Sequence, residues 1–139
     1  MFNDDELLWE AVQASGSNVA HIYPEGNKRL AMIGDVVLKL VVLEDLRPQN
    51  MNRGSMDTIV QRTVKNPELE RIGRQNNLEQ LVNVNPSQQG IVPSRTITDT
   101  FEAVIGAVYL DSGKDLESVR LVIARLGLWG QEPEQLASL

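Results

Sequence analysis

The hydrophobic pattern of this chain is densest between residues 30 and 43, where almost every position is apolar. No polar stripe there is wide enough for a surface helix, so the pattern predicts a buried helix from about Lys28 to Leu46 that ends before Pro48. One carboxylate, Asp35, interrupts the run. A lone carboxylate in apolar surroundings is costly unless a cation compensates it or it becomes protonated, so we expect Asp35 to meet a partner.

Apolar residues at helical spacing predict further helices along the chain. Their expected ranges are 4–14, 55–65, 96–111 and 116–126, together with a helix that starts at residue 66 and ends between residues 73 and 77; Ser55 and Asn66 are the expected N-caps. Residues 78–82 fit either one more turn of helix or irregular structure. Because no strand pattern and no internal repeat competes, we predict an all-α fold with six or seven helices around two central ones, residues 28–46 and 96–111.

The length of 139 residues fits one domain, 1–139, with a core at about 4–127 and a tail at 128–139. Cysteine is absent and His21 is the only histidine, which excludes disulfides and thiol nucleophiles and leaves oxygen ligands for any metal. The first residues lack the pattern of a signal peptide, and the longest apolar run is too short to span a membrane. We therefore expect an intracellular protein with no membrane partner.

Charge is distributed unevenly along the chain. The formal net charge is −6, yet residues 47–74 hold six basic residues against three acidic ones, a local charge of +3. A chain with a negative net charge does not bind polyanions indiscriminately, so this segment is the one that can face an anion.

Two acids on the second central helix are candidates to join Asp35. Asp99 and Glu102 are three residues apart and so share a helix face, and they converge with Asp35 if the helices cross near Gly34 and Gly106. Each mid-helix glycine lowers helix stability by about 1 kcal/mol relative to alanine, and such glycines usually occur where two backbones approach closely. Three clustered carboxylates need a cation or a raised pKa, and a hard divalent ion is the natural occupant.

Simpler explanations exist for the same acids. Asp99 and Glu102 fall in the expected first turn of their helix, where the helix dipole favours acids. Asp35 can pair with Arg29, Lys39 or Arg95, and Thr98 is most simply the N-cap of the helix that follows it. The residue pattern alone therefore reaches an acidic metal site in a helical domain and specifies no substrate.

Two segments resemble the motifs of the ribonuclease III domain. Residues 27–38, NKRLAMIGDVVL, resemble its signature helix, typically Asn-Glu-Arg-Leu-Glu-Phe-Leu-Gly-Asp-(Ala/Ser)-Val-Leu. Residues 99–113, DTFEAVIGAVYLDSG, are similar to its second motif, Asp-x-x-Glu-Ala-x-x-Gly-Ala-x-Tyr-Leu-Asp-x-Gly, and the spacing between the two motifs also fits. Short stand-alone fungal members of this family are similar too.

This resemblance implies an all-α endonuclease fold that homodimerises through the signature helix and receives double-stranded RNA in a valley across the dimer. It implies magnesium, or manganese, at the active sites. By position, Asp35, Asp99 and Glu102 match metal ligands that serve catalysis, with Glu102 closest to the catalytic metal. Met32 falls where the family places an aromatic that plugs into the partner subunit, and Ile33 and Val36 join it at the implied dimer interface.

The expected single domain leaves no room for a separate double-stranded-RNA-binding domain, so phosphate contacts are assigned to the nuclease domain itself. The residues expected to make them are Lys28, Arg29, Arg53, Arg62, Lys65 and Arg95.

Two positions depart from the family pattern. Ala31 stands where a glutamate ligand is usual, and Lys28 replaces a second glutamate of the signature helix. Mini-ribonuclease III enzymes also read Ala-x-x-Gly-Asp at this turn and are nucleases. Three hypotheses therefore stand: a metal-dependent endoribonuclease, a catalytically inactive RNA-binding or assembly module with the same fold, and a helical interaction protein that binds no RNA.

Overall fold

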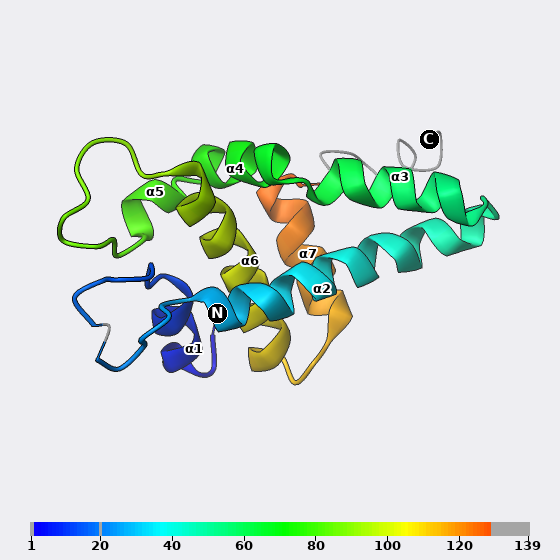
Figure 1. Cartoon of the computed structure of the whole chain (residues 1–139). Coiled ribbons are helices and arrows are strands. Elements are labelled where there is room, and N and C mark those ends of the chain that lie inside the picture. Colours follow the sequence, from blue (N-terminus) through cyan, green and yellow to red (C-terminus); the bar gives the residue numbers. More distant parts are fainter. Residues whose placement is uncertain (1, 20, 129–139) are drawn as a thin grey trace.

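The computed structural model describes residues 2–19 and 21–128. This part of the chain forms seven α-helices and one short 3-10 helix (Figure 1). Their bounds are α1 Asp5–Ala11, α2 Lys28–Leu46, η1 Arg47–Gln49, α3 Arg53–Val64, α4 Asn66–Gln75, α5 Leu78–Leu81, α6 Ser94–Asp111 and α7 Leu116–Leu126. Within the described ranges there is no strand, and one isolated bridge joins Gln13 to Asn83. The predicted all-α class is confirmed.

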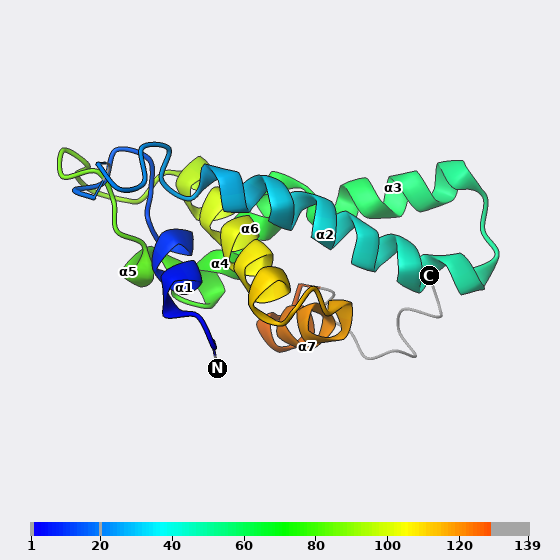
Figure 2. The same ribbon diagram turned by 90° about the horizontal axis from the view of Figure 1, so that it is seen from below.

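The long helices α2 and α6 form the centre of the molecule. They pack chiefly against each other, α4 covers α6, and α3 returns beside the C-terminal half of α2 as the second arm of a hairpin. The two views agree that α1 and α5 lie at the opposite end from this hairpin (Figure 2). The acids predicted to converge lie on these two central helices, Asp35 in the N-terminal half of α2 and Asp99 and Glu102 on α6.

Two glycines set the crossing of α2 and α6. A Cβ atom on Gly34 would lie 1.7 Å from the carbonyl oxygen of Glu102, and one on Gly106 would lie 2.4 Å from the carbonyl oxygen of Leu30. Neither helix has space for a side chain at these positions, because each backbone lies against the other. The predicted crossing at Gly34 and Gly106 is confirmed.

The main hydrophobic core lies on one side of this crossing. Fully buried side chains of α2, α4, α6 and α7 fill it, among them Leu38, Leu69, Phe101, Ile105 and Ile123. A second cluster, made largely of small residues, lies where α1 meets the crossing and contains Ala11, Leu30, Ala31, Ala103 and Ala107. Small side chains allow the three helices to approach closely there, as the glycines do at the centre.

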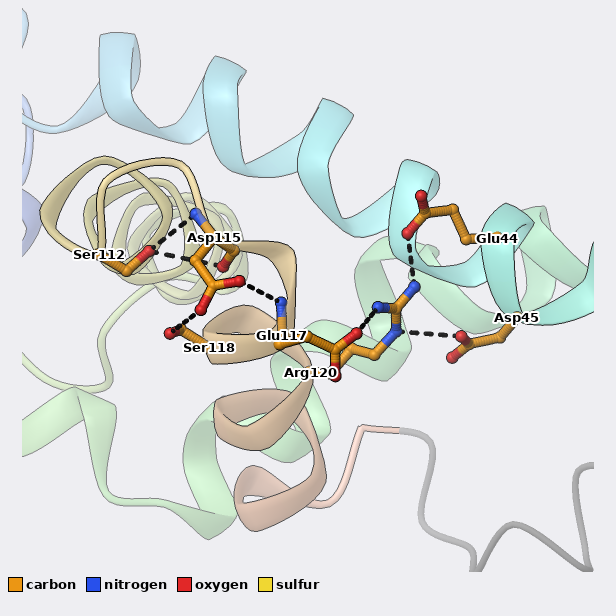
Figure 3. Close-up of polar contacts among 7 residues, drawn as sticks. All are labelled: Glu44, Asp45, Ser112, Asp115, Glu117, Ser118 and Arg120. Carbon is orange, nitrogen blue, oxygen red and sulfur yellow. Dashed lines mark hydrogen bonds and ion pairs between the residues drawn. The ribbon is translucent and has the colours of Figure 1, made fainter.

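Polar contacts connect the ends of the central helices to the rest of the fold. Asn27 is buried, and its Nδ2 donates to the carbonyl oxygen of Ala11 at 2.8 Å and to Oγ1 of Thr100 at 3.0 Å, which fixes the start of α2. At the other end of α2, Arg120 of α7 pairs with Glu44 and with Asp45, the latter at 3.0 Å from its Nε (Figure 3). Both ends of α2 are therefore held in place.

The structure corrects the prediction that α2 is buried on all sides. Met32 is 74% exposed and Val36 is 64% exposed. They belong to a continuous exposed stripe along α2, which we call the α2 apolar stripe: Met32, Ile33, Val36, Leu40 and Leu43. A helix that is apolar on all faces is buried only if other elements pack against every face, but the helices described here pack against one face of α2.

Several helix ends differ from the predictions. Helix α3 begins at Arg53 because Asn52, and not Ser55, caps it by accepting from the Ser55 backbone N–H at 2.8 Å. Helix α6 begins two residues early, at Ser94, so Thr98 is not an N-cap; its buried hydroxyl donates to the Ser94 carbonyl oxygen at 2.8 Å.

Other local predictions are settled as well. Asn66 is the first residue of α4 and not its cap, α1 ends at Ala11, and residues 78–81 are helical. Leu128 is buried against the core, and the remainder of the predicted tail, 129–139, lies outside the described residues. Among the helices described, none is both long and apolar enough to cross a membrane.

The crossing predicts the effect of one methyl group. Gly34→Ala is expected to lower the free energy of unfolding by ~3 kcal/mol or more, because the new Cβ meets a backbone carbonyl that cannot move without shifting α6. Urea denaturation followed by circular dichroism measures this loss. Gly54→Ala is the control, since the nearest atom to its Cβ is 3.5 Å away, and it should be neutral or slightly stabilising. Equal effects of the two substitutions would contradict the close crossing.

Candidate acidic site between α2 and α6

A pocket of about 510 Å³ lies beside the crossing of α2 and α6. It contains the three acids that the sequence predicted to converge, Asp35, Asp99 and Glu102. Its other lining residues are Glu25, Lys28, Arg29, Ala31, Met32, Asn66 and Arg95. The site thus combines carboxylates from both central helices with basic side chains at its margin.

Glu102 is the most perturbed acid of the pocket. Its pKa is raised to about 8, first because burial disfavours the carboxylate, then because Asp35 shares a hydrogen bond with it and adds negative charge. Asp99 raises this pKa further, and the nearby Lys39 opposes the shift. At neutral pH Glu102 therefore holds a proton in its hydrogen bond to Asp35, and this proton relieves the repulsion between the two carboxyl groups.

Each aspartate of the pocket has a cation four residues away on its own helix. Nζ of Lys39 lies 3.2 Å from Oδ2 of Asp35, and Nε of Arg95 lies 3.1 Å from Oδ1 of Asp99. Among the partners predicted for Asp35, the structure selects Lys39. The Asp35 side chain is 37% exposed, which corrects the expectation of a carboxylate enclosed by apolar groups, because it faces the pocket and not the core.

The early start of α6 changes the simpler explanation for the other two acids. Asp99 is the sixth residue of the helix, and Glu102 lies a further turn along. The field of the helix N-terminus falls off within the first turn, so the dipole does not account for these carboxylates.

The donors present suit a hard divalent cation in their chemistry, since they are carboxylate oxygens and include a pair that shares a proton. In the arrangement described, however, no three His, Cys, Asp or Glu side chains are placed to hold one ion together. The carboxylate of Asp99 is paired with Arg95, while Asp35 and Glu102 contact each other. An ion shared by all three acids would therefore have to bind a carboxylate that Arg95 already contacts through Oδ1.

The two departures from the family pattern have distinct environments. Ala31 is 6% exposed, and it packs among the small residues of the second core cluster while its edge lines the pocket. It offers no oxygen ligand there. Lys28 is exposed at the first turn of α2, also on the pocket wall.

The six predicted phosphate-binding residues divide into two groups. Lys28, Arg29 and Arg95 line the pocket. Lys65 immediately precedes Asn66, another lining residue, whereas Arg53 begins α3 at the end of the molecule far from the crossing (Figure 1). Arg62 lies in the last turn of α3. The structure thus brings three of the six residues together at the acids.

Sequence reasoning missed two lining residues, Glu25 and Asn66. Glu25 lies in the loop before α2, and Asn66 lies at the start of α4. No local sequence pattern predicts that either residue lies near the crossing, because the loop conformation places Glu25 and the packing of α4 places Asn66. Lys39 carried such a signal, since a cation four residues after Asp35 on a helix faces it.

A family model described as Ribonuclease-III-like matches residues 4–125 of the chain. The match covers most of the sequence, and the chain therefore belongs to the ribonuclease-III-like family.

Two bacterial proteins named Ribonuclease 3 illustrate the sequence similarity. The protein from Vibrio vulnificus strain YJ016 is 35% identical over 127 residues, which cover 88% of this chain and 53% of the relative. The protein from Nitratidesulfovibrio vulgaris is 35% identical over 118 residues, which cover 81% of this chain and 47% of the relative. The chain thus spans about half the length of these curated relatives.

The fold is similar to a solved nuclease domain of ribonuclease III from Campylobacter jejuni. The TM-score is 0.79 at 26% sequence identity, and the alignment covers 91% of this chain and 87% of that domain. That structure is described in terms of flexibility in a region involved in dimer formation. The predicted ribonuclease III endonuclease-domain fold is confirmed.

The raised pKa of Glu102 predicts how its replacement changes stability with pH. The folded protein binds a proton at Glu102 up to about pH 8, whereas the unfolded chain releases it near pH 4.5. The free energy of unfolding therefore falls as pH rises between these two values, because the folded state still holds a proton that the unfolded state has already released. Glu102→Gln keeps the hydrogen-bonding shape without the ionisation. With a chelator present to remove divalent ions, the Glu102→Gln protein should melt about 3 °C or more above the wild type at pH 8. At pH 4.5 the difference should be about 1 °C or less.

Differential scanning calorimetry across this pH range measures the effect. Asp57→Asn, an exposed carboxyl on α3, is the control and should shift the melting temperature little at either pH. A Glu102→Gln protein no more stable than the wild type at pH 8 would contradict the environment described for Glu102.

Proposed function

We propose that this chain is a divalent-metal-dependent endoribonuclease that hydrolyses phosphodiester bonds of double-stranded RNA as a homodimer. Membership of the ribonuclease-III-like family supports the reaction class. The observation that carries the proposal is the meeting of Asp35 and Glu102, from different helices, at a crossing that two glycines keep close. Carboxyl groups held this close repel each other when both are ionised, so they bind either a proton or a cation, and a cation can replace the shared proton.

In this proposal Asp35, Asp99 and Glu102 hold Mg²⁺, with Mn²⁺ as a substitute, and serve catalysis as its ligands. When bound, the ion supplies a water of lowered pKa and offsets the charge that develops on the phosphate. The chain's own residues prepare this state. Glu102 gives up the proton that it shares with Asp35, and the rigid crossing keeps the two carboxylates on the same pocket wall.

The basic residues on the pocket margin are proposed to bind the RNA backbone. Lys28, Arg29 and Arg95 lie beside the acids, where a phosphate would have to enter. Helix α3 carries Arg53 and Arg62, and Lys65 directly follows it. These three residues are proposed to contact a duplex that extends along α3. Such contacts set affinity and salt dependence without reading sequence, which suits recognition of an RNA duplex by its shape.

The α2 apolar stripe is proposed as the homodimer interface. It includes the three residues predicted for this role, Met32, Ile33 and Val36, and Met32 also lines the pocket. An interface there would border the acidic site, so two copies would bring two sites to one surface. The solved relative from Campylobacter jejuni, which is described as having a region involved in dimer formation, supports an interface within this fold.

A catalytically inactive RNA-binding or assembly module is the second candidate. Ala31 removes one carboxylate from the pocket wall, and Lys28 adds a positive charge there. Both changes weaken the attraction of the pocket for a divalent ion. This candidate retains the dimer and the RNA surface but predicts no cleavage.

Cleavage of a long, labelled RNA duplex at low salt tests the proposal directly. With Mg²⁺ or Mn²⁺ the wild type should yield short duplex products, and Glu102→Gln should reduce the rate by about a hundredfold or more, because one ligand and its negative charge are lost. Asp57→Asn is the matched control and should cleave like the wild type. Absence of cleavage by a folded, RNA-binding wild type would favour the inactive module, and cleavage that survives Glu102→Gln would reject the assigned site.

The interface assignment makes a separate prediction. Val36→Asp places a charge in the centre of the α2 apolar stripe and should weaken self-association by about tenfold or more, because the carboxylate loses its hydration in the interface. Sedimentation equilibrium measures the dimer dissociation constant. Leu121→Asp, at an equally exposed apolar residue of α7, is the control and should leave self-association unchanged. The reverse pattern would move the interface away from α2.

A further inference from the structure

The two aspartates of the acidic pocket are each neutralised from within their own helix. Lys39 lies 3.2 Å from Asp35 on α2, and Arg95 lies 3.1 Å from Asp99 on α6. Both cations stand four residues from their aspartate, so the helix geometry places each pair on one face. The chain therefore carries two positive charges in contact with the groups that would hold a divalent ion.

These ion pairs are placed where they can open. The Lys39 side chain is 40% exposed and the Arg95 side chain is 75% exposed, so both cations retain access to water. The Lys39–Asp35 pair is weak, since Asp35 is also 37% exposed, solvent screens the attraction and the flexible side chain loses entropy on pairing. The Asp99 side chain is only 13% exposed, so the Arg95–Asp99 pair is screened mainly on the side of the guanidinium. A divalent ion that offers a stronger attraction can therefore take their place.

The ion pairs occur together with an arrangement in which the acids do not gather around one point. While Arg95 engages Asp99, that carboxylate is directed to the guanidinium, and in the described part of the chain no three acidic, histidine or cysteine side chains are placed around a common ion position. Ala31 supplies no further oxygen on the pocket wall. The metal-free arrangement is thus compensated by the protein's own charges.

We propose that Lys39 and Arg95 are internal counter-cations of the pocket, which compete with a divalent ion for Asp35 and Asp99 and so set how tightly that ion binds. This inference rests on the proposed function, because it takes the acidic pocket as the metal site. It makes Lys39 and Arg95 positioning residues, which act through the aspartates that they hold. Its consequence is that removing either cation strengthens metal binding, the opposite of the effect of removing an acid.

Mn²⁺ binding to the full chain tests this proposal without RNA and without activity. The free Mn²⁺ signal in electron paramagnetic resonance, combined with isothermal titration calorimetry, gives the dissociation constant for each protein. Lys39→Met and Arg95→Met should each tighten binding about fivefold, since a unit positive charge within a few ångströms of the ion is removed. The double variant should bind more tightly than either single variant.

Two control variants separate direct competition from general charge. Arg71→Met removes a cation that pairs with Glu68 on α4; neither residue lines the pocket, and the substitution should leave the dissociation constant unchanged. Lys28→Met removes a cation of the pocket wall that makes no ion pair within the described residues, and should tighten binding less than Lys39→Met or Arg95→Met does, because Lys28 pairs with neither aspartate. Circular dichroism confirms the fold of each protein, and Lys39→Gln and Arg95→Gln repeat the comparison with polar side chains.

The outcomes distinguish this inference from the proposed function. If Asp35→Asn weakens Mn²⁺ binding but Lys39→Met and Arg95→Met do not tighten it, the competition is rejected while the metal site stands. If Mn²⁺ binds to none of the proteins, both are rejected. Binding by the double variant at concentrations where the wild type binds weakly would support the competition most strongly.

Discussion

The close approach of α2 and α6 at Gly34 and Gly106 is the constraint on which the rest of this structure depends. At that point the backbone of each helix occupies the space that a side chain of the other would need. Because the helices cannot separate there without loss of packing, the groups that flank the glycines have fixed neighbours. Asp35 follows Gly34 directly, and Glu102 provides the carbonyl that Gly34 contacts, so the crossing itself places these two carboxyl groups on one pocket wall.

The electrostatics of the pocket follow from this enforced proximity. Two carboxyl groups at the crossing respond by sharing a proton, which raises the pKa of Glu102 to about 8. Lys39 and Arg95 then balance the aspartates from their own helices. A scaffold selected for stability alone has no need for acids at this position, since apolar side chains would pack there without repulsion. This unfavourable charge supports the proposed function, and the family to which the chain belongs agrees with that proposal.

Much of this arrangement could be predicted because helical periodicity and mid-helix glycines are local signals. The range of α2, the crossing at Gly34 and Gly106, and the shared pocket of Asp35, Asp99 and Glu102 all follow from them. The exposed face of α2 did not follow, because an apolar residue such as Val36 reads the same whether the chain covers it or leaves it exposed.

Side-chain competition limited the prediction in other places. Three cations were possible partners for Asp35, and only the folded structure selects Lys39 and assigns Arg95 to Asp99. Thr98 has the composition of a helix cap, but Pro93 and Ser94 already start α6, so its hydroxyl bonds back within the helix. Glu25 and Asn66 reach the pocket through tertiary placement, which no short sequence pattern encodes.

Anomalous diffraction from crystals soaked in Mn²⁺ tests most directly whether the α2–α6 crossing builds a divalent-metal site. An anomalous peak within contact distance of the carboxylates of Asp35 and Glu102 is the expected result. A peak located elsewhere on the chain, or none in this pocket under conditions where Mn²⁺ binding is saturated in solution, would contradict the proposed site.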